Sequence, residues 1–407
     1  MEYIIGILIL VSFFGLAFYA AKGGNLMMGM LVMAILWTVL PMIGNTFPTN
    51  PAFVAANAEN VGITWIQAFS KVFQSGPEGW GTVLVNVVFG AWFGRVLLET
   101  GIASTLIRKT TELGGDKPAV TCILLCIVTT AIFSSLFGAG AVVAIGVIIL
   151  PILMSLGIPK VLSVVSFMLS IGAGMFLNPV LFGQYTAFFL DAEGRTTYPY
   201  EEYVRWGGIA LAVQLIFTIC LVLFCMRKKK TVHSWAARRP IRQKMDFAPG
   251  KSLLTPFIPV FLLIVFKVPI IMGFLIGGFY ALFVCGKLKN FRTACRTFNK
   301  DFFDGVVDTA PLVGFLLMVP MFNKAAELCI PYFNALLGNV IPHSTLFITI
   351  IFCALAPLGL FRGPFTLYGC GAATLGILKG IGFSTAFLAP LMIASTTVMN
   401  VSCCITQ

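Results

Sequence analysis

The residues with the clearest potential for chemistry lie where long apolar stretches are interrupted by glycine or proline. In LAPLGLFRGPFTLYGCG (355–371), Arg362 directly precedes Gly363 and Pro364. An arginine at bilayer depth is costly and is seldom kept without a role, and its planar guanidinium suits a carboxylate. A helix break at the Gly-Pro pair would leave backbone N–H groups beside the same anion. The stretch therefore predicts an anion site, with an arginine that snorkels to the membrane surface as the structural alternative.

Interrupted apolar segments recur in two matched pairs along the chain. The first pair is TTAIFSSLFGAGA (129–141) and APLGLFRGPFT (356–366), and the second is GAGMFLNPVLFGQ (172–184) and ASTTVMNVSCCITQ (394–407). Backbone inside hydrocarbon must be hydrogen-bonded internally, so a break is expected only where it lines protein or a watery cavity. Transporters use such breaks to bind ions and anionic substrates. Any single break also fits a glycine packing face with hydroxyls bonded to their own helix, but the paired recurrence favours a binding site.

The predicted substrate-binding residues are the polar and helix-breaking residues of these segments. They are Ser134, Ser135, Gly138, Ala139, Gly140, Asn178, Pro179, Arg362, Gly363, Pro364, Thr366, Ser395, Thr396, Thr397 and Asn400. Because the segments contain no Asp or Glu, a coupling cation would be bound by oxygen atoms alone, which suits sodium. The expected sodium ligands are Ser135, Asn178, Thr397 and Asn400. A proton carried on the substrate is the other option, and no further cofactor and no catalytic residue is expected.

The composition places these segments in a membrane. Of 407 residues, 58% are hydrophobic and 10% are charged, whereas soluble domains have about 25% charged residues. Apolar runs long enough to cross a bilayer recur from end to end, which predicts an all-α, polytopic inner-membrane protein. The predicted spans are 3–21, 25–43, 80–98, 118–135, 139–156, 161–177, 204–226, 253–266, 269–285, 305–322, 345–360, 364–379 and 385–399. The first is expected to be a retained helix, because it lacks the basic start of a signal peptide.

Clusters of basic residues indicate the topology. The loop 227–251, which contains RKKK and RRPIRQK, is predicted to be cytoplasmic, and so is GKLKNFRTACRTFNK (286–300). The stretch 253–285 between them must then be a hairpin, turning at 267–269. These loops account for the net charge of +12, so anionic lipid and the positive-inside rule explain the charge and no nucleic acid is expected as a partner.

Charged residues also lie near the ends of the predicted spans. Arg95 and Glu99 lie four residues apart at the end of the span 80–98, a spacing that predicts a surface ion pair within one helix. Asp304 and Asp308 lie at the start of another span, near its expected cytoplasmic edge.

The order of the elements repeats in the two halves of the chain. Each half has two helices, an amphipathic arm, a span, a second amphipathic helix and then broken segments. The arms are ITWIQAFSKVFQSGPEGW (63–80) and LKNFRTACRTFNKDFFDG (288–305). We expect both arms to lie in the membrane interface, the first outside and the second inside. At an offset of 225, GAGAVVAIGVIILPILMSLGI (138–158) aligns with GPFTLYGCGAATLGILKGIGF (363–383) and shares glycine, leucine and isoleucine positions with it. These features predict two inverted repeats.

The expected domain organisation follows from the repeat. Residues 1–226 form the first repeat (scaffold helices 3–98, transport elements 118–184, linking helix 204–226), 227–252 the basic loop, and 253–407 the second repeat (scaffold 253–322, transport elements 345–407).

The run SSLFGAGAVVAIGVIILPILMSLGIP (134–159) resembles the corresponding stretch of the gluconate permease and citrate transporter families of the ion-transporter superfamily. The resemblance covers nearly the whole chain in architecture, but individual motifs only around 134–184 and 359–400. It implies re-entrant hairpins and discontinuous helices, a scaffold and a transport subdomain, a homodimer, and elevator-like movement of carboxylates with sodium or protons. The Ser-Asn-Thr signature of dicarboxylate members is absent, and LNPV (177–180) and STTVMNVS (395–402) stand in its place.

Together these features predict a secondary active transporter of a small organic anion, a carboxylate or sugar acid, in the bilayer of a bacterial-type inner membrane. A sodium/proton antiporter of the same broad fold is the alternative, although it would need a titratable carboxylate that the broken segments lack. A membrane-embedded enzyme is disfavoured, because His233 and His343 lie in predicted loops and the scattered acids form no nucleophile–base pair or metal cluster.

Overall fold

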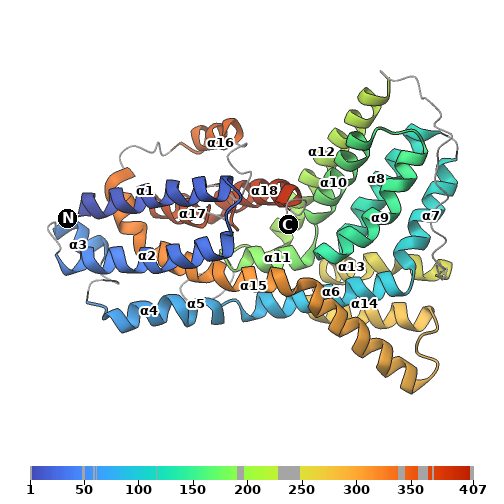
Figure 1. Ribbon diagram of the computed structural model, residues 1–407, viewed down its shortest axis with the longest axis horizontal. Helices are drawn as coiled ribbons and strands as arrows, with labels where there is room; N and C mark the ends of the chain where they lie inside the picture. The colour runs from blue at the N-terminus through green and yellow to red at the C-terminus, as the bar shows by residue number, and fades with distance from the viewer. Residues whose placement is uncertain are drawn as a thin grey trace. The chain divides into compact units, whose positions relative to one another are not determined.

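Helices are the regular elements of the described part of the chain (Figure 1). The computed structural model describes residues 2–47, 51–57, 60, 62–115, 117–189, 197–227, 248–337, 344–355, 365–368 and 371–403. The elements are α1 (Glu2–Ala21), α2 (Leu26–Thr46), α3 (Pro51–Ala56), α4 (Trp65–Phe73), α5 (Ser75–Glu78), α6 (Gly81–Glu99), α7 (Ile102–Gly114), α8 (Pro118–Phe133), α9 (Ala139–Ser155), α10 (Lys160–Met175), α11 (Pro179–Thr186), α12 (Tyr200–Arg227), η1 (Gly250–Phe257), α13 (Ile258–Val265), α14 (Ile270–Val284), α15 (Phe291–Leu337), α16 (Thr345–Ala354), α17 (Gly371–Gly380) and α18 (Thr385–Cys403). The predicted all-α class is confirmed for these residues.

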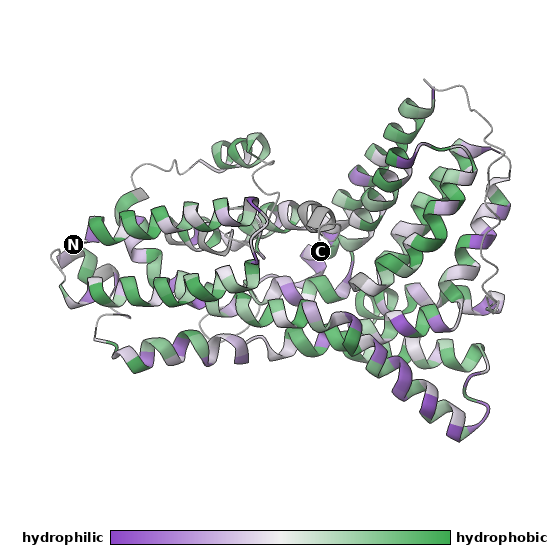
Figure 2. Cartoon of the chain, in the orientation of Figure 1, coloured by the Kyte–Doolittle hydropathy of each residue, from purple (hydrophilic) through white to green (hydrophobic). Residues whose placement is uncertain are grey.

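Several helices are long and apolar enough to cross a membrane. Within the described residues there are 5 such segments, or up to 6 if the bent pair of α10 and α11 is one span. The 5 segments are Glu2–Ala20, Leu26–Thr46, Trp65–Glu99, Tyr200–Arg227 and Phe291–Leu336. Hydrophobic residues cover much of α1, α2 and α9 (Figure 2). The architecture is consistent with a polytopic membrane protein.

The chain forms two compact units, and each draws on both halves of the sequence. Unit 1 comprises residues 1–84, 185–198 and 312–407, and unit 2 comprises residues 85–184 and 199–311. The long helix α15 contributes its first part to unit 2 and its second part to unit 1.

Unit 1 is organised around α2. This helix packs against α1 and α4, and α18 packs against α16 and α17. Trp37 of α2 is fully buried, with its ring centroid 6.3 Å from Phe13 and 5.0 Å from Phe322, and its indole N–H donates to the Ser12 hydroxyl over 2.8 Å. The amphipathic helix α4 begins at a capping box, in which the side chains of Thr64 and Gln67 each accept a hydrogen bond from the other's backbone N–H group.

Unit 2 is a bundle in which α8 packs against α7, α10 and α12, while α9 contacts α7, α8 and α10 (Figure 1). Small residues allow α8 and α10 to approach closely. A Cβ atom on Gly174 would collide with the Thr130 carbonyl, and the Thr130 hydroxyl donates to the Ser170 carbonyl over 3.0 Å. This contact holds together two helices that both end at a break.

The predicted hairpin between the two basic segments is confirmed. α13 and α14 pack against each other and are joined by a short turn at 266–269. Lys267 in this turn has a φ of 52°, in the left-handed region. Its ammonium group lies 2.6 Å from the Glu201 carboxylate, and both side chains are largely exposed.

Three of the four predicted breaks are present. α8 ends at Phe133 and α9 begins at Ala139, and α10 and α11 are separated by residues 176–178 with a bend of 62°. α16 ends at Ala354 and α17 begins at Gly371, and the described residues between them, 365–368, are not helical.

Two predictions of separate elements were wrong. The segment 394–403 is not interrupted, because α18 runs through it as one helix. The second amphipathic arm is not separate from the following span, because α15 is a single helix of 47 residues. Residues 288–305 and 394–403 contain no proline, so each residue there keeps the backbone N–H that an α-helix uses. The prolines of α15 and α18 lie outside these two segments, at positions 311, 320, 331 and 390.

Candidate functional site

The first break in unit 2 separates α8 from α9. α8 begins with Pro118 in its first turn, where a missing N–H removes no intrahelical bond, and it ends at Phe133. Gly138 then adopts φ 110° and ψ 149°, a conformation that residues with a side chain rarely adopt. The helix α9 starts at the next residue. Its first N–H groups have no partner within the helix and form the positive end of its dipole.

Asn178 joins this break to the bend between α10 and α11. Its side chain is fully buried, and its amide nitrogen donates to the carbonyls of Phe133 and Leu136, each over 3.0 Å. Its amide oxygen accepts from Val180 N at 2.9 Å and Leu181 N at 3.4 Å. One side chain therefore satisfies carbonyls at the end of α8 and N–H groups at the start of α11. Both donors and the acceptor are committed to the backbone.

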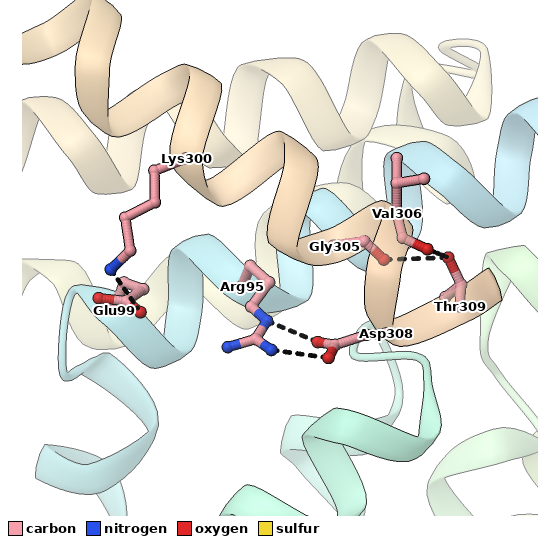
Figure 3. Close-up of polar contacts among 7 residues, drawn as sticks. All are labelled: Arg95, Glu99, Lys300, Gly305, Val306, Asp308 and Thr309. Atoms are coloured by element: carbon pink, nitrogen blue, oxygen red, sulfur yellow. Dashed lines mark hydrogen bonds and ion pairs between the residues drawn. The ribbon is translucent and has the colours of Figure 1, made fainter.

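An ion pair lies at the first turn of α9. The Nε and Nη2 atoms of Arg95 on α6 donate to the two carboxylate oxygens of Asp308 on α15, over 2.5 and 2.6 Å (Figure 3). The side chains are 28% and 20% exposed. A Cβ atom built on Gly140 would lie 2.6 Å from the carboxyl carbon of Asp308. The guanidinium of Arg95 and the carboxylate of Asp308 thus meet beside the N-terminus of α9. This is the positive end of a helix that begins within the apolar stretch 118–155.

The prediction that Arg95 pairs with Glu99 was wrong. Glu99 instead accepts a hydrogen bond from Lys300 over 3.2 Å, so two ion pairs connect α6 with the first part of α15 (Figure 3). The side chains at positions 95 and 99 both lie toward α15, and each finds a charge of opposite sign there. A partner on another helix replaces the partner one turn along the same helix.

Replacing Gly140 by alanine tests the contact with Asp308. We expect Gly140→Ala to push the carboxylate away from Arg95 and to lower stability by roughly 1–3 kcal/mol, the usual effect of overpacking. The measurement is thermal unfolding of the purified full chain in detergent. Gly208→Ala on α12 is the matched control, because nothing lies within 4 Å of its built Cβ, and it should leave the unfolding temperature unchanged or raise it. Equal changes in both variants would contradict the contact.

The two serines of the first break bond to their own helix. Ser134 Oγ donates to Ala131 O over 2.8 Å and Ser135 Oγ donates to Ile132 O over 3.4 Å. Both side chains are buried. Hydroxyls bonded to their own helix are what the structural alternative for this break predicts. The helix α8 nevertheless ends beside the two serines, at Phe133.

In unit 1, hydroxyl groups of α18 hold the non-helical residues 365–368. Thr396 Oγ accepts from Leu367 N over 2.9 Å, and Ser395 Oγ donates to Phe365 O over 2.6 Å. Both hydroxyls come from the segment that was predicted to be broken. The uninterrupted helix α18 therefore serves as the support for the neighbouring break.

Two tyrosines and a lysine lie near this support in unit 1. The hydroxyls of Tyr185 and Thr397 are 2.9 Å apart, and the Tyr185 ring stacks on Tyr368 with centroids 5.8 Å apart. The Lys379 ammonium group donates to the Phe188 carbonyl over 2.8 Å. Sequence analysis did not select these residues. Of the three, only Lys379, a charge at the end of the predicted span 364–379, gave a signal in the sequence.

The predicted binding residues divide between the two units. Unit 2 contains Ser134, Ser135, Gly138, Gly140, Asn178 and Pro179. Unit 1 contains Thr366, Ser395, Thr396 and Thr397. Arg362, Gly363 and Pro364 lie outside the described residues, as do the side chains of Ala139 and Asn400.

Of the four predicted sodium ligands, Ser135 and Asn178 both lie in unit 2, and the structure describes both of their side chains. Their polar hydrogens bond to backbone carbonyls, and the amide oxygen of Asn178 accepts two N–H groups. Across the described residues, no three His, Cys, Asp or Glu side chains form a group that could hold a metal ion.

Sequence analysis placed Arg95 and Asp308 at span ends but missed their pairing, because it paired Arg95 only with an acid on the same helix. Asp308 comes from another helix, and its only sequence signal was its position at the start of a predicted span.

The sequence matches no protein-family model and no curated protein.

Proposed function

We propose that the protein is a secondary active transporter that moves a small organic anion, a carboxylate or sugar acid, together with a cation. In this proposal two inverted repeats form a scaffold and a transport part, and the protein works as a homodimer by elevator-like alternating access. The membrane is a bacterial-type inner membrane, and the loop 227–251 is cytoplasmic.

The observation that carries the proposal is the position of the Arg95–Asp308 pair. A bidentate guanidinium–carboxylate contact lies at the first turn of a helix that begins inside an apolar stretch. Guanidinium groups and helix N-termini both favour anions. A soluble carboxylate would be recognised by the same chemistry. The interrupted helices also support the proposal, because Asn178 satisfies backbone groups that a break in hydrocarbon would leave unpaired.

A sodium/proton antiporter is the second candidate, and Asp308 favours it. The sequence offered no acid in the broken segments, but the carboxylate of Asp308 lies against Gly140 at the start of α9. A titratable group at that position is what an exchanger of cations would require. Sodium-driven proton flux in liposomes without any organic anion would support this candidate.

A ligand screen tests the transporter. The full chain in detergent should gain thermal stability from one class of carboxylate or sugar acid, since a ligand at about 100 times its Kd adds about 2.7 kcal/mol. The stabilising anion should then accumulate in proteoliposomes under a cation gradient.

Arg362→Ala should greatly weaken binding of this anion without changing expression. The control is Arg292→Ala, which replaces an exposed arginine of α15 and should leave binding unchanged. Binding unchanged in Arg362→Ala would remove that residue from the site, and no response to any anion would contradict the function.

A further inference from the structure

Asp301 on α15 is a buried acid that has no hydrogen-bond partner in the part of the chain that the structure describes. Its side chain is 1% exposed. Neither of its carboxylate oxygens has a hydrogen-bond partner among the described residues. An ionised carboxylate in such a place is penalised by several kcal/mol, whereas its neutral form is much less penalised.

Two neighbouring residues locate the face of α15 on which Asp301 lies. Phe298 and Gly305 lie about one turn before and after Asp301, so they share its helix face. The Phe298 ring lies 5.4 Å from the Trp92 ring, and a Cβ on Gly305 would lie 2.9 Å from Trp92 N. Asp301 therefore lies on the face of α15 that packs against α6.

The charges of four residues act on Asp301 electrostatically. Glu99 comes from α6, Lys300 and Asp304 from α15, and Lys287 from the turn after α14. The nearest lysine along the chain, Lys300, points its ammonium group toward Glu99, at 3.2 Å (Figure 3). The carboxylate of Asp301 is not hydrogen-bonded to this ammonium group.

From these contacts we propose that Asp301 takes up the coupling proton and that this uptake favours anion binding at Arg95. The proposal rests on the transport function proposed above and names its coupling ion. In the step, one proton from water adds to one carboxylate oxygen of Asp301, and no other bond changes. A proton needs only this one carboxylate, whereas a metal ion would require several oxygen ligands.

The link to Arg95 follows from position and charge. Asp308 lies about two turns after Asp301 on α15 and therefore on the same helix face. Neutralising Asp301 removes one negative charge from a region that already holds Glu99, Asp304 and Asp308. An incoming anion at Arg95 is then repelled less. Because linkage is reciprocal, a bound anion also favours the protonated form, which is the requirement for transport of both in the same direction.

The first test is the pH dependence of stability in the full chain, measured without any substrate. Burial without a hydrogen bond penalises the ionised carboxylate more than the neutral acid, so the wild-type unfolding temperature should rise as the pH is lowered across the acidic range. Asp301→Asn, which mimics the protonated form, should be more stable than wild type at neutral pH and should lose this rise. Asp304→Asn is the matched control and should keep it. Equal pH profiles for wild type and Asp301→Asn would overturn proton uptake at Asp301.

The second test is uptake of the stabilising anion in proteoliposomes. Wild-type accumulation should be driven by an inward proton gradient, and Asp301→Asn should lose all gradient-driven accumulation while Asp304→Asn keeps it. Accumulation in Asp301→Asn equal to wild type would overturn the proposal, and so would a wild type driven by sodium alone. If the wild type transports no anion, the transport function fails, whereas the stability profiles still report on the proton at Asp301.

Discussion

Arg95→Gln should abolish anion uptake and lower the free energy of unfolding by roughly 2–4 kcal/mol. The substitution leaves the Asp308 carboxylate without its two hydrogen bonds beside α9. Removal of one member of a fully buried pair costs about 3–5 kcal/mol, and we expect less here because the two side chains are 28% and 20% exposed. Thermal unfolding of the full chain and uptake in proteoliposomes are the measurements.

A double-mutant cycle separates the charge from the contact. Asp308→Asn alone should also destabilise, since it leaves the guanidinium without its anion. The double variant Arg95→Gln with Asp308→Asn should be more stable than the sum of the single effects predicts, because no uncompensated charge remains. Its uptake should stay absent, because the guanidinium of Arg95 is no longer there to bind the substrate. Glu201→Gln, which breaks the exposed pair with Lys267, is the control and should change neither property. Additive single effects would contradict the ion pair.

Asn178→Leu should lower the free energy of unfolding by roughly 3 kcal/mol and abolish uptake. It removes the cap of α11, worth about 1 kcal/mol, and leaves two buried carbonyls without donors, at about 1 kcal/mol each. Thermal unfolding and uptake of the stabilising anion provide the measurements.

Asn178→Asp separates the acceptor role of the side chain from its donor role. Its carboxylate still accepts from Val180 N and Leu181 N, but it faces the carbonyls of Phe133 and Leu136 with no hydrogen to donate. We therefore expect it to retain the bend at α11 and to disturb the break after α8. Asn25→Ala on α2 removes a cap alone and should cost only about 1 kcal/mol. An effect of Asn178→Leu no larger than that of Asn25→Ala would show that Asn178 does not hold the breaks together.

The sequence determined the features that depend on neighbouring residues. Long apolar runs predicted an all-α membrane architecture, and basic clusters predicted the hairpin that turns near Lys267. The breaks before α9 and α11 were predicted because Gly138 and Pro179 act on the backbone at their own positions. The same local method failed for α15 and α18. There, an amphipathic pattern and a run of small polar residues resembled interruptions, but neither one breaks the backbone hydrogen bonding of a helix.

Only the tertiary structure decided which side chains meet. Arg95 and Asp308 are 213 residues apart in sequence, and their contact depends on how α6 and α15 are rotated about their axes. The sequence placed Arg95 near Glu99 because both lie on one helix, yet each residue faces a charge on α15. The burial of Asp301 is decided in the same way, since Asp301 lies on the face of α15 that packs against α6. Spacing along a chain specifies a helix face, and packing specifies what that face contacts.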